Sequence, residues 1–204
     1  MQISEQLQQH PLIPVITLNK SKQAKPLAEC LINAGLSIFE ITLRTEAALE
    51  SIQRIKQAFP DALVGAGTVI SPAQMRSIIE VGCDFAVSPG LNRELVQIAT
   101  EAKLPYLPGV STCSEIMHAH ALGLRCLKLF PAELSGGIPY LKQLGSLFPD
   151  LQFCPTGGVD LKNYKDYLAL NNVIAIGGSF LAPTELIDNG NWSELTRLLE
   201  RIYR

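Results

Sequence analysis

Short apolar runs rich in β-branched residues alternate along the chain with longer stretches whose apolar residues recur at helical spacing. This pattern predicts strands for the short runs and amphipathic helices for the stretches between them. Eight strands are predicted, at Leu12–Thr17, Ser37–Arg44, Leu63–Val69, Phe85–Pro89, Tyr106–Val110, Cys126–Phe130, Gln152–Thr156 and Val173–Ile176. The predicted helices are Lys22–Ala34, Glu46–Ala58, Pro72–Val81, Arg93–Ala102, Ser114–Leu122, Ile138–Leu147, Leu161–Leu170 and Trp192–Tyr203.

Regular alternation of strand and helix implies parallel strands joined by right-handed crossovers. Eight units in 204 residues fit one (β/α)₈ barrel, a TIM barrel, as a single domain over residues 1–204. An open doubly wound sheet is the competing architecture, but the glycine-rich dinucleotide turn that it usually carries is absent after Thr17. In a barrel, catalytic groups are expected where the strands end, on one face.

Composition narrows the range of partners. A net charge of -2 gives no reason to expect nucleic acid or an anionic membrane as a partner. No apolar run approaches the roughly 18 residues of a membrane span, and the first ten residues lack the pattern of a signal peptide. A cytoplasmic location is therefore expected. The five cysteines are scattered without metal-ligand spacing, which favours free thiols, and neither a metal nor a cofactor is expected.

Lys128, in the run CLKLFPAE, is the one lysine inside a short apolar segment with strand character. Burying an ammonium group is costly, so the protein must pair this lysine or hold it uncharged. An uncharged lysine is a nucleophile, and its natural partner is a carbonyl carbon. The alternative is an edge-strand lysine whose stem lies on apolar surface while its head reaches water.

Polar residues gather at the ends of other predicted strands. In FEITLRT, alternation places Glu40, Thr42 and Arg44 on the face opposite the apolar residues, which is the barrel interior. A structural ion pair is one interpretation; a shared ligand between Glu40 and Arg44 is the other. In GAGTV, Thr68 reaches the rim above small residues, where glycines permit close approach of a ligand or of neighbouring backbone.

The last two strands end in CPTGGVD and IGGSF. In barrels of this class the loops after strands seven and eight often form a phosphate site, and glycines there leave backbone N–H groups unobstructed. Tight turns that need glycine would explain the same residues. We favour phosphate binding because a Gly-Gly pair occurs at both positions: Gly157 with Gly158, beside Thr156, and Gly177 with Gly178, followed by Ser179.

An ordered set of short motifs resembles the 2-keto-3-deoxy-6-phosphogluconate (KDPG) aldolases, also called 4-hydroxy-2-oxoglutarate (KHG) aldolases. In chain order these motifs are FEITLRT, GAGTV, SPG, PGVST, LKLFPAE, CPTGGV and IGGS. The blocks extend over essentially the whole chain. The resemblance implies a lysine-dependent (class I) aldolase on a barrel fold. It would cleave KDPG to pyruvate and glyceraldehyde 3-phosphate, and KHG to pyruvate and glyoxylate.

The resemblance also implies roles for individual residues. Lys128 corresponds to the Schiff-base lysine and Glu40 to the general acid/base. Residues around the pyruvoyl part of the substrate correspond to Arg44, Thr68, Pro89 and Phe130. The phosphate end and the substrate chain correspond to Thr156, Gly157, Gly158, Gly177, Gly178 and Ser179. A homotrimer is expected, because the family is commonly trimeric.

Three alternatives stay open at this stage. An aldolase for the galactonate epimer of the same substrate would share the lysine and carboxylate. A phosphosugar isomerase or epimerase would keep the phosphate turns without needing an interior lysine. A non-catalytic phosphosugar-binding barrel would have no reason to direct Lys128, Glu40 and Arg44 toward one cavity.

Overall fold

The computed structural model describes residues 3–203. Its strands are β1 Leu12–Ile16, β2 Ile38–Thr42, β3 Leu63–Gly67, β4 Phe85–Val87, β5 Tyr106–Leu107, β6 Gly109–Val110, β7 Cys126–Leu129, β8 Gln152–Phe153 and β9 Ile176–Gly178. Its α-helices are α1 Ile3–Gln9, α2 Ala24–Asn33, α3 Ala48–Ala58, α4 Pro72–Glu80, α5 Arg93–Glu101, α6 Cys113–Ala121, α7 Gly137–Leu147, α8 Tyr164–Leu168, α9 Thr184–Asp188 and α10 Trp192–Tyr203. Two 3₁₀-helices, η1 Ser21–Gln23 and η2 Ser179–Leu181, complete the elements.

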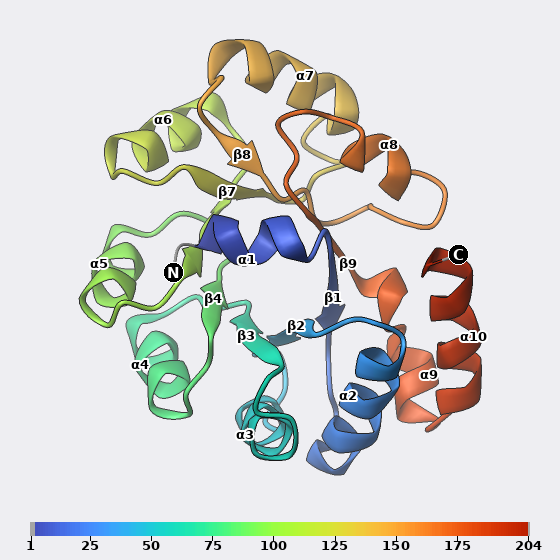
Figure 1. Cartoon of the computed structure of the whole chain (residues 1–204). Helices are drawn as coiled ribbons and strands as arrows, with labels where there is room; N and C mark the ends of the chain where they lie inside the picture. Colours follow the sequence, from blue (N-terminus) through green and yellow to red (C-terminus); the bar gives the residue numbers. More distant parts are fainter. Residues whose placement is uncertain (1–2, 204) are drawn as a thin grey trace.

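The strands form a curled parallel sheet of six strands, in the order β5-β4-β3-β2-β1-β9, and a parallel sheet of three, in the order β6-β7-β8. Pro108 alone separates β5 from β6. Isolated parallel bridges join Phe153 to Val173 and Thr156 to Gly177 at the other edge. The predicted parallel α/β architecture is confirmed, in the form of these two linked sheets surrounded by helices (Figure 1).

Two apolar clusters hold the layers together. The larger one lies between the strands and the surrounding helices and includes Phe39 and Ile41 of β2, both fully buried. The smaller one includes Ile38 from the same strand and fills the concave side of the sheet. Alternate residues of one strand therefore pack in opposite directions, as strand geometry requires.

Helix α1 closes one end of this interior. Its residues Ile3 and Leu7 are buried in the smaller cluster, and Figure 1 shows the helix lying across the strands. Because α1 directly precedes β1, and Ile3 and Ser4 lie beside the starts of β5 and β7, the closed end is the one where the strands begin. The opposite end, where catalytic groups of such folds collect, is left for the site.

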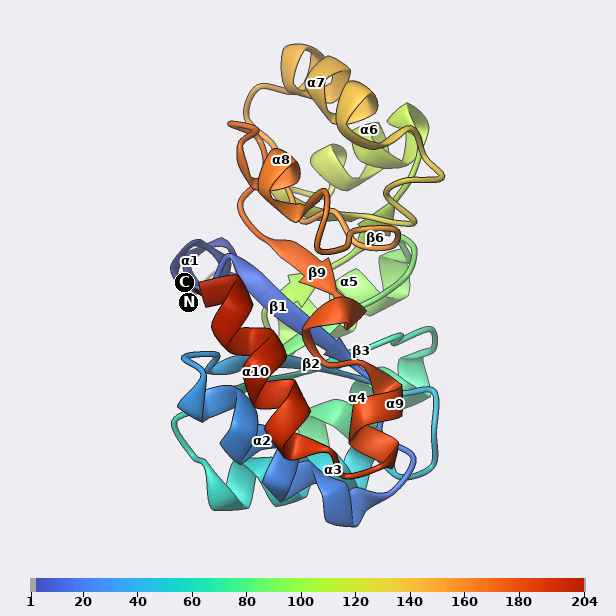
Figure 2. The same ribbon diagram turned by 90° about the vertical axis from the view of Figure 1, so that its right-hand side faces the viewer.

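Several sequence-predicted boundaries differ from the structure. The polar segment of α1 and the short helix α9 were not predicted. The predicted strand Ser37–Arg44 ends at Thr42, so Arg44 lies in a turn. The predicted eighth strand, Val173–Ile176, is displaced toward the C-terminus. Val173 forms an isolated bridge, and the paired strand begins at Ile176 and extends to Gly178. In Figure 2, β9 lies beside β1, to which it pairs in register.

Candidate active site

Lys128 and Glu40 form a buried pair in the interior between the two sheets. Lys128 Nζ lies 3.2 Å from Glu40 Oε1, and the two side chains are 6% and 4% exposed. They come from β7 and β2, which are not neighbours in either sheet, so the contact spans the interior. The pairing keeps each charge compensated at a depth where an isolated one would be costly, and it leaves a proton donor and an acceptor in direct contact.

The carboxylate of Glu40 occupies space that only a glycine on the neighbouring strand leaves open. A Cβ placed on Gly67 would lie 2.1 Å from Glu40 Oε1 and 2.7 Å from its Cγ and Cδ. The next residue, Thr68, has φ +58°, a conformation that β-branched residues rarely adopt. Backbone strain of this kind often marks a functional site. Thr68 therefore lies at the end of β3, as predicted. The role of Gly67 in leaving room for the Glu40 carboxylate was not predicted.

Phe130 and Cys154 flank the lysine. Lys128 Nζ lies 5.2 Å from the centre of the Phe130 ring, within the range of a cation–π contact. Cys154 is fully buried, and burial raises the pKa of its thiol to about 12, an effect that Lys128 opposes and Glu40 reinforces. A thiol so held is neutral, so it forms part of the wall around the lysine without being a nucleophile. Cys154 was noted in the sequence only as one of the scattered cysteines.

Arg44 occupies a different position from the one predicted. It is exposed in the turn after β2, outside the interior that Glu40 and Thr42 share. Threonine hydroxyls anchor this turn: Thr42 donates to the Ile16 carbonyl at 3.0 Å, and Thr45 donates to the Leu18 carbonyl at 2.5 Å. Within residues 3–203, Arg44 has no ion-pair or hydrogen-bond partner. Its guanidinium is therefore available to an anionic ligand.

Arg44 lines a cavity of about 230 Å³ together with most of the predicted phosphate residues. The cavity also contacts Phe130, so it extends from the aromatic neighbour of Lys128 toward solvent. Its lining consists of Val15, Arg44, Phe130, Thr156, Gly157, Gly158, Val159, Gly177 and Ser179.

The turn after β8 presents backbone donors to this cavity. Gly157 and Gly158 have φ +92° and +82°, values that favour glycine. Among residues 3–203 no acceptor takes the N–H groups of Gly157, Gly158 or Val159. Unpaired N–H groups along a turn of this type form a concave anion site. Val159 was not predicted as a site residue, because a valine gives no sequence signal for a backbone donor.

The second Gly-Gly pair is not a turn, which corrects the prediction. Gly177 and Gly178 lie in β9, and Ser179 begins η2 as an exposed residue. A Cβ on Gly177 would meet Thr156 Oγ1 at 2.4 Å, and one on Gly178 would meet the Phe180 ring at 2.3 Å. These glycines are therefore required for close packing, and of the two only Gly177 lines the cavity.

Pro89 lies near Lys128 but not in that cavity. Gly109, which pairs with Lys128 in the sheet, would carry its Cβ 2.3 Å from the Pro89 carbonyl, so the SPG segment packs closely over β6. Ser88 anchors the segment through hydrogen bonds with the Tyr106 hydroxyl at 2.6 Å and the Gly90 carbonyl at 2.7 Å. Pro89 is thus placed at the rim beside the lysine strand.

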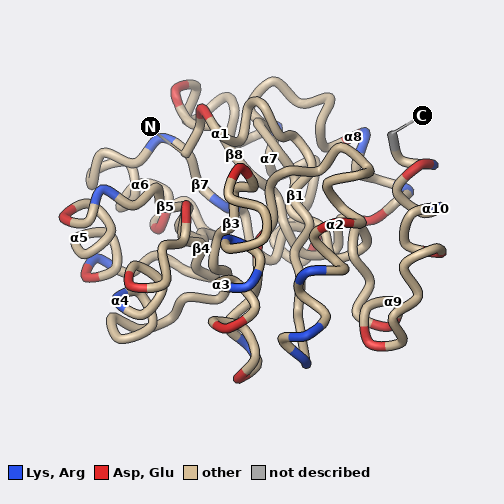
Figure 3. The backbone as a smooth tube through the Cα atoms, turned by 60° about the horizontal axis from the view of Figure 1, so that its bottom comes forward, with Lys and Arg blue, Asp and Glu red and all other residues tan. Residues whose placement is uncertain are grey.

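The other Lys, Arg, Asp and Glu positions are distributed along the outer helices and loops (Figure 3). Within residues 3–203, no group of three or more His, Cys, Asp or Glu side chains has an arrangement that suits a metal ion. No helix in the same range is long and apolar enough to cross a bilayer.

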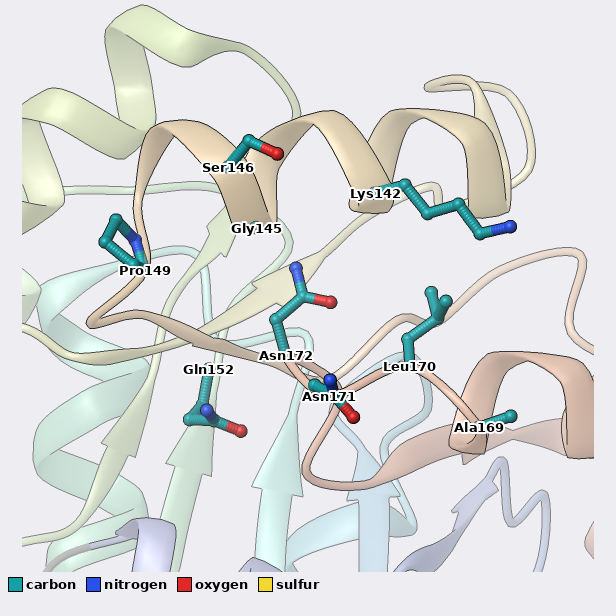
Figure 4. A pocket seen from close by; sticks show the side chains of 9 residues that line it. All are labelled: Lys142, Gly145, Ser146, Pro149, Gln152, Ala169, Leu170, Asn171 and Asn172. Carbon is teal, nitrogen blue, oxygen red and sulfur yellow. The ribbon is translucent and has the colours of Figure 1, made fainter.

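A larger hollow, of about 380 Å³, lies between α7 and the segment after α8 (Figure 4). Gln152, at the start of β8, lines it, so it belongs to the end of the fold opposite to Thr156 and its glycine turn. Lys142 is its single charged residue, and the Asn172 amide is already bonded to the Leu141 carbonyl at 2.8 Å. The chemistry therefore concentrates at the Lys128 end.

Comparison with known proteins agrees with this geometry. The family model described as KDPG and KHG aldolase matches residues 3–198. The 2-dehydro-3-deoxy-phosphogluconate aldolase of Dickeya dadantii is 47% identical over 92% of this chain and 88% of its own length. The KHG/KDPG aldolase of Escherichia coli (strain K12) is 44% identical over the same shares.

Among solved structures, the KDPG aldolase of Legionella pneumophila, with pyruvate captured as a covalent carbinolamine intermediate, is 43% identical. It superposes with a TM-score of 0.95 over 98% of this chain and 97% of that one. The chain therefore belongs to the KDPG and KHG aldolase family.

Proposed function

We propose that this protein is a class I aldolase that cleaves KDPG to pyruvate and glyceraldehyde 3-phosphate, and KHG to pyruvate and glyoxylate. The observation that carries the proposal is the buried contact of Lys128 Nζ with Glu40 Oε1 at 3.2 Å. Phe130, beside Lys128 Nζ, also lines the cavity that holds Arg44 and the Gly157–Gly158 turn. An isomerase or a binding protein would have no use for this pair, because neither forms an imine with a ketone.

The pair suits each step of the reaction. Once Lys128 has lost a proton, its amine attacks the C2 ketone, and loss of water gives an iminium ion. The iminium accepts the electron pair of the C3–C4 bond while Glu40 takes the proton of the C4 hydroxyl, which releases the aldehyde. The enamine that remains is protonated at C3, and water then frees pyruvate from Lys128. A positioned acid/base group of this kind contributes about 10²–10⁴ in rate.

The substrate's two anionic ends have separate partners in this proposal. Arg44 binds the carboxylate next to the ketone, Phe130 packs on the pyruvoyl group, and Thr68 and Pro89 border it. The phosphate binds the N–H groups of the Gly157–Gly158 turn, together with the Ser179 hydroxyl, with Thr156 and Gly177 beside the substrate chain and Gly178 supporting β9. Binding energy at the phosphate end orients C4 toward Glu40.

Pyruvate release tests the proposal. The purified protein is offered KDPG, its galactonate epimer and KHG, without added metal, and pyruvate is followed with a coupled dehydrogenase. Turnover of KDPG and KHG is the expected result, and the relative rates on the two epimers decide between the gluconate and galactonate preferences. Absence of pyruvate from all three substrates would overturn the proposal.

We propose further that the two sheets act as one closed eight-stranded barrel. The single-residue gap at Pro108 and the bridge from Thr156 to Gly177 support this closure. Residues 1–204 form one domain, supported by the match of the family model over residues 3–198. The protein assembles as a homotrimer. It is located in the cytoplasm, an inference from composition.

A further inference from the structure

Glu133, in the loop after β7, is bonded to the predicted phosphate turn and to α8. Its backbone N–H donates to the Gly157 carbonyl at 3.1 Å. Its Oε1 accepts a short hydrogen bond from the Tyr167 hydroxyl and a weaker one, at 3.4 Å, from Asn163 Nδ2. The same Asn163 amide donates to the Gly158 carbonyl at 3.0 Å. Both glycine carbonyls are therefore occupied on the side away from the cavity.

The stem of Glu133 also fixes the turn sterically. A Cβ on Gly158 would lie 2.4 Å from Glu133 Cγ, so the glycine backbone rests directly on this side chain. The carboxylate points toward the start of α7, where a Cβ on Gly137 would lie 3.4 Å from Oε1. A helix N-terminus stabilises a negative charge, which explains how a carboxylate is accommodated so near a site for an anion.

Tyr167 completes the support as a neutral donor. It is fully buried, and burial raises the pKa of its phenol, with the hydrogen bond to Glu133 acting in the same direction. The phenol therefore keeps its proton at neutral pH and donates it to Glu133. Glu133 from the loop after β7, together with Asn163 and Tyr167 from the region of α8, thus holds the Gly157–Gly158 turn in a single conformation.

We propose that Glu133, supported by Tyr167 and Asn163, is a positioning residue that holds the Gly157–Gly158 turn open for the substrate phosphate. The inference rests on the proposed function and extends it, because it assigns the preference for a phosphorylated substrate to a residue that need not touch the substrate. Without the carboxylate, the turn loses its support and its N–H groups no longer converge. The affinity for the substrate phosphate should then fall, while the rate of the reaction at Lys128 should stay the same.

Steady-state kinetics on KDPG and on KHG, which lacks the phosphate, test this inference. For Glu133→Ala we expect KM for KDPG to rise about tenfold and KM for KHG to change less than twofold. Inorganic phosphate, used as a competitive inhibitor of KDPG cleavage, should bind about tenfold more weakly to the variant. Glu133→Gln keeps an acceptor oxygen and the stem, so it should restore most of the affinity.

Tyr167→Phe provides a second test that retains the packing of the ring. It should weaken KDPG and phosphate binding in the same selective manner, by about threefold. Tyr140→Phe is the matched control, since the Tyr140 hydroxyl contacts Cys113 Sγ at 3.6 Å and not the turn. It should leave both substrates unaffected.

The outcomes separate the two proposals. If the unaltered protein cleaves neither substrate, the proposed function fails. If it cleaves both, but Glu133→Ala and Tyr167→Phe change KDPG and KHG equally or not at all, the positioning role of Glu133 is overturned. Should Glu133→Ala fail to fold, the Tyr167→Phe result alone decides.

Discussion

At the scale of single residues, the site depends on the space left by a missing side chain as much as on the groups that react. Lys128 and Glu40 were predicted from an apolar run and from strand alternation, and the structure brings their side chains into contact. Gly67 was not singled out, although it leaves the room in which the Glu40 carboxylate lies. That role depends on the register of two strands, which the sequence does not state.

The substitution Gly67→Ala tests this requirement for space. The added methyl group would lie 2.1 Å from Glu40 Oε1, so the buried carboxylate must move away from Lys128. Because a displacement of about 1 Å at a catalytic group can cost about 10² in rate, we expect kcat on KDPG to fall by about that factor.

Gly90→Ala is the matched control, because a Cβ there meets nothing within 4 Å and the backbone conformation suits alanine. Its kcat should remain within about twofold of the original. Unchanged kcat in Gly67→Ala would mean that the observed position of Glu40 is not required for catalysis.

The predicted positions of Arg44 and of the Gly177–Gly178 pair were wrong, because each was inferred from its own segment alone. The alternation in FEITLRT extends to Arg44, but the strand ends two residues earlier, and the arginine is exposed on the cavity wall. In IGGSF, the two glycines lie in the strand and not in a turn. They are glycines because Thr156 and Phe180 leave no room for a side chain at these positions. In both cases the deciding contacts are tertiary ones, which alternation along a single segment does not reveal.

At the scale of elements, most helices could be predicted because their apolar residues recur at helical spacing. In the structure, Ser71 and Asn92 cap α4 and α5, since each side chain accepts a hydrogen bond from the first turn of its helix. Helix α1 gave no such signal. Its segment ISEQLQQ is mostly polar, and its place at the closed end depends on two apolar residues, Ile3 and Leu7.

Truncating Leu7 tests the contribution of α1 to stability. This side chain is fully buried in the interior cluster, so Leu7→Ala should lower the free energy of unfolding by about 2–5 kcal/mol. Chemical denaturation provides the measurement. Gln8→Ala, at an exposed position of the same helix, should cost less than about 0.5 kcal/mol. Equal, small effects of both would show that α1 does not close the interior in solution.

The start of α6 gives a pH-dependent prediction. Burial disfavours the charge of Glu115, but hydrogen bonds from Ser111 and Thr112 outweigh it and lower the pKa of this carboxyl from its usual 4.5. A lowered pKa stabilises the folded state at higher pH, and the contribution is lost as pH falls below the unfolded value and through the folded one.

Glu115→Gln should therefore destabilise the protein by about 1 kcal/mol at pH 7, with the difference from the original protein shrinking in acid. Thermal unfolding measured between neutral pH and pH 3 follows this change. Glu94→Gln, in the first turn of α5, is the control, since no partner among residues 3–203 bonds to its carboxylate. A difference that stays constant down to pH 3 would rule out a stabilising role for the ionised Glu115 carboxylate.

At the scale of the whole molecule, the alternation of strand and helix was sufficient to predict a parallel α/β architecture. It was not sufficient to show how the sheet divides at Pro108, because a two-residue strand is too short to carry a period. The polarity of the fold could be predicted as well. Site residues collect where the strands end, and α1 fills the other end.

The proposed trimer requires part of the protein surface to be buried between subunits. Large apolar side chains are exposed at Ile70, Met117, Leu134 and Leu147, and Leu134 is 89% exposed. Exposed apolar side chains mark a site of self-association where they form one contiguous patch, so the proposal requires that some of these side chains meet across the subunit interface. Sedimentation equilibrium at micromolar concentration should give the mass of three chains. A mass of one chain at every concentration would contradict the assembly.

The central claim is that the amine of Lys128 forms an imine with a keto acid. Incubation with pyruvate followed by borohydride reduces such an imine to a stable secondary amine, and peptide mass spectrometry then locates it. We expect one reduced pyruvyl adduct on the peptide that contains Lys128, with loss of activity, and neither adduct nor turnover in Lys128→Met. An unaltered protein that cleaves KDPG but forms no adduct at Lys128 would contradict imine formation by this residue.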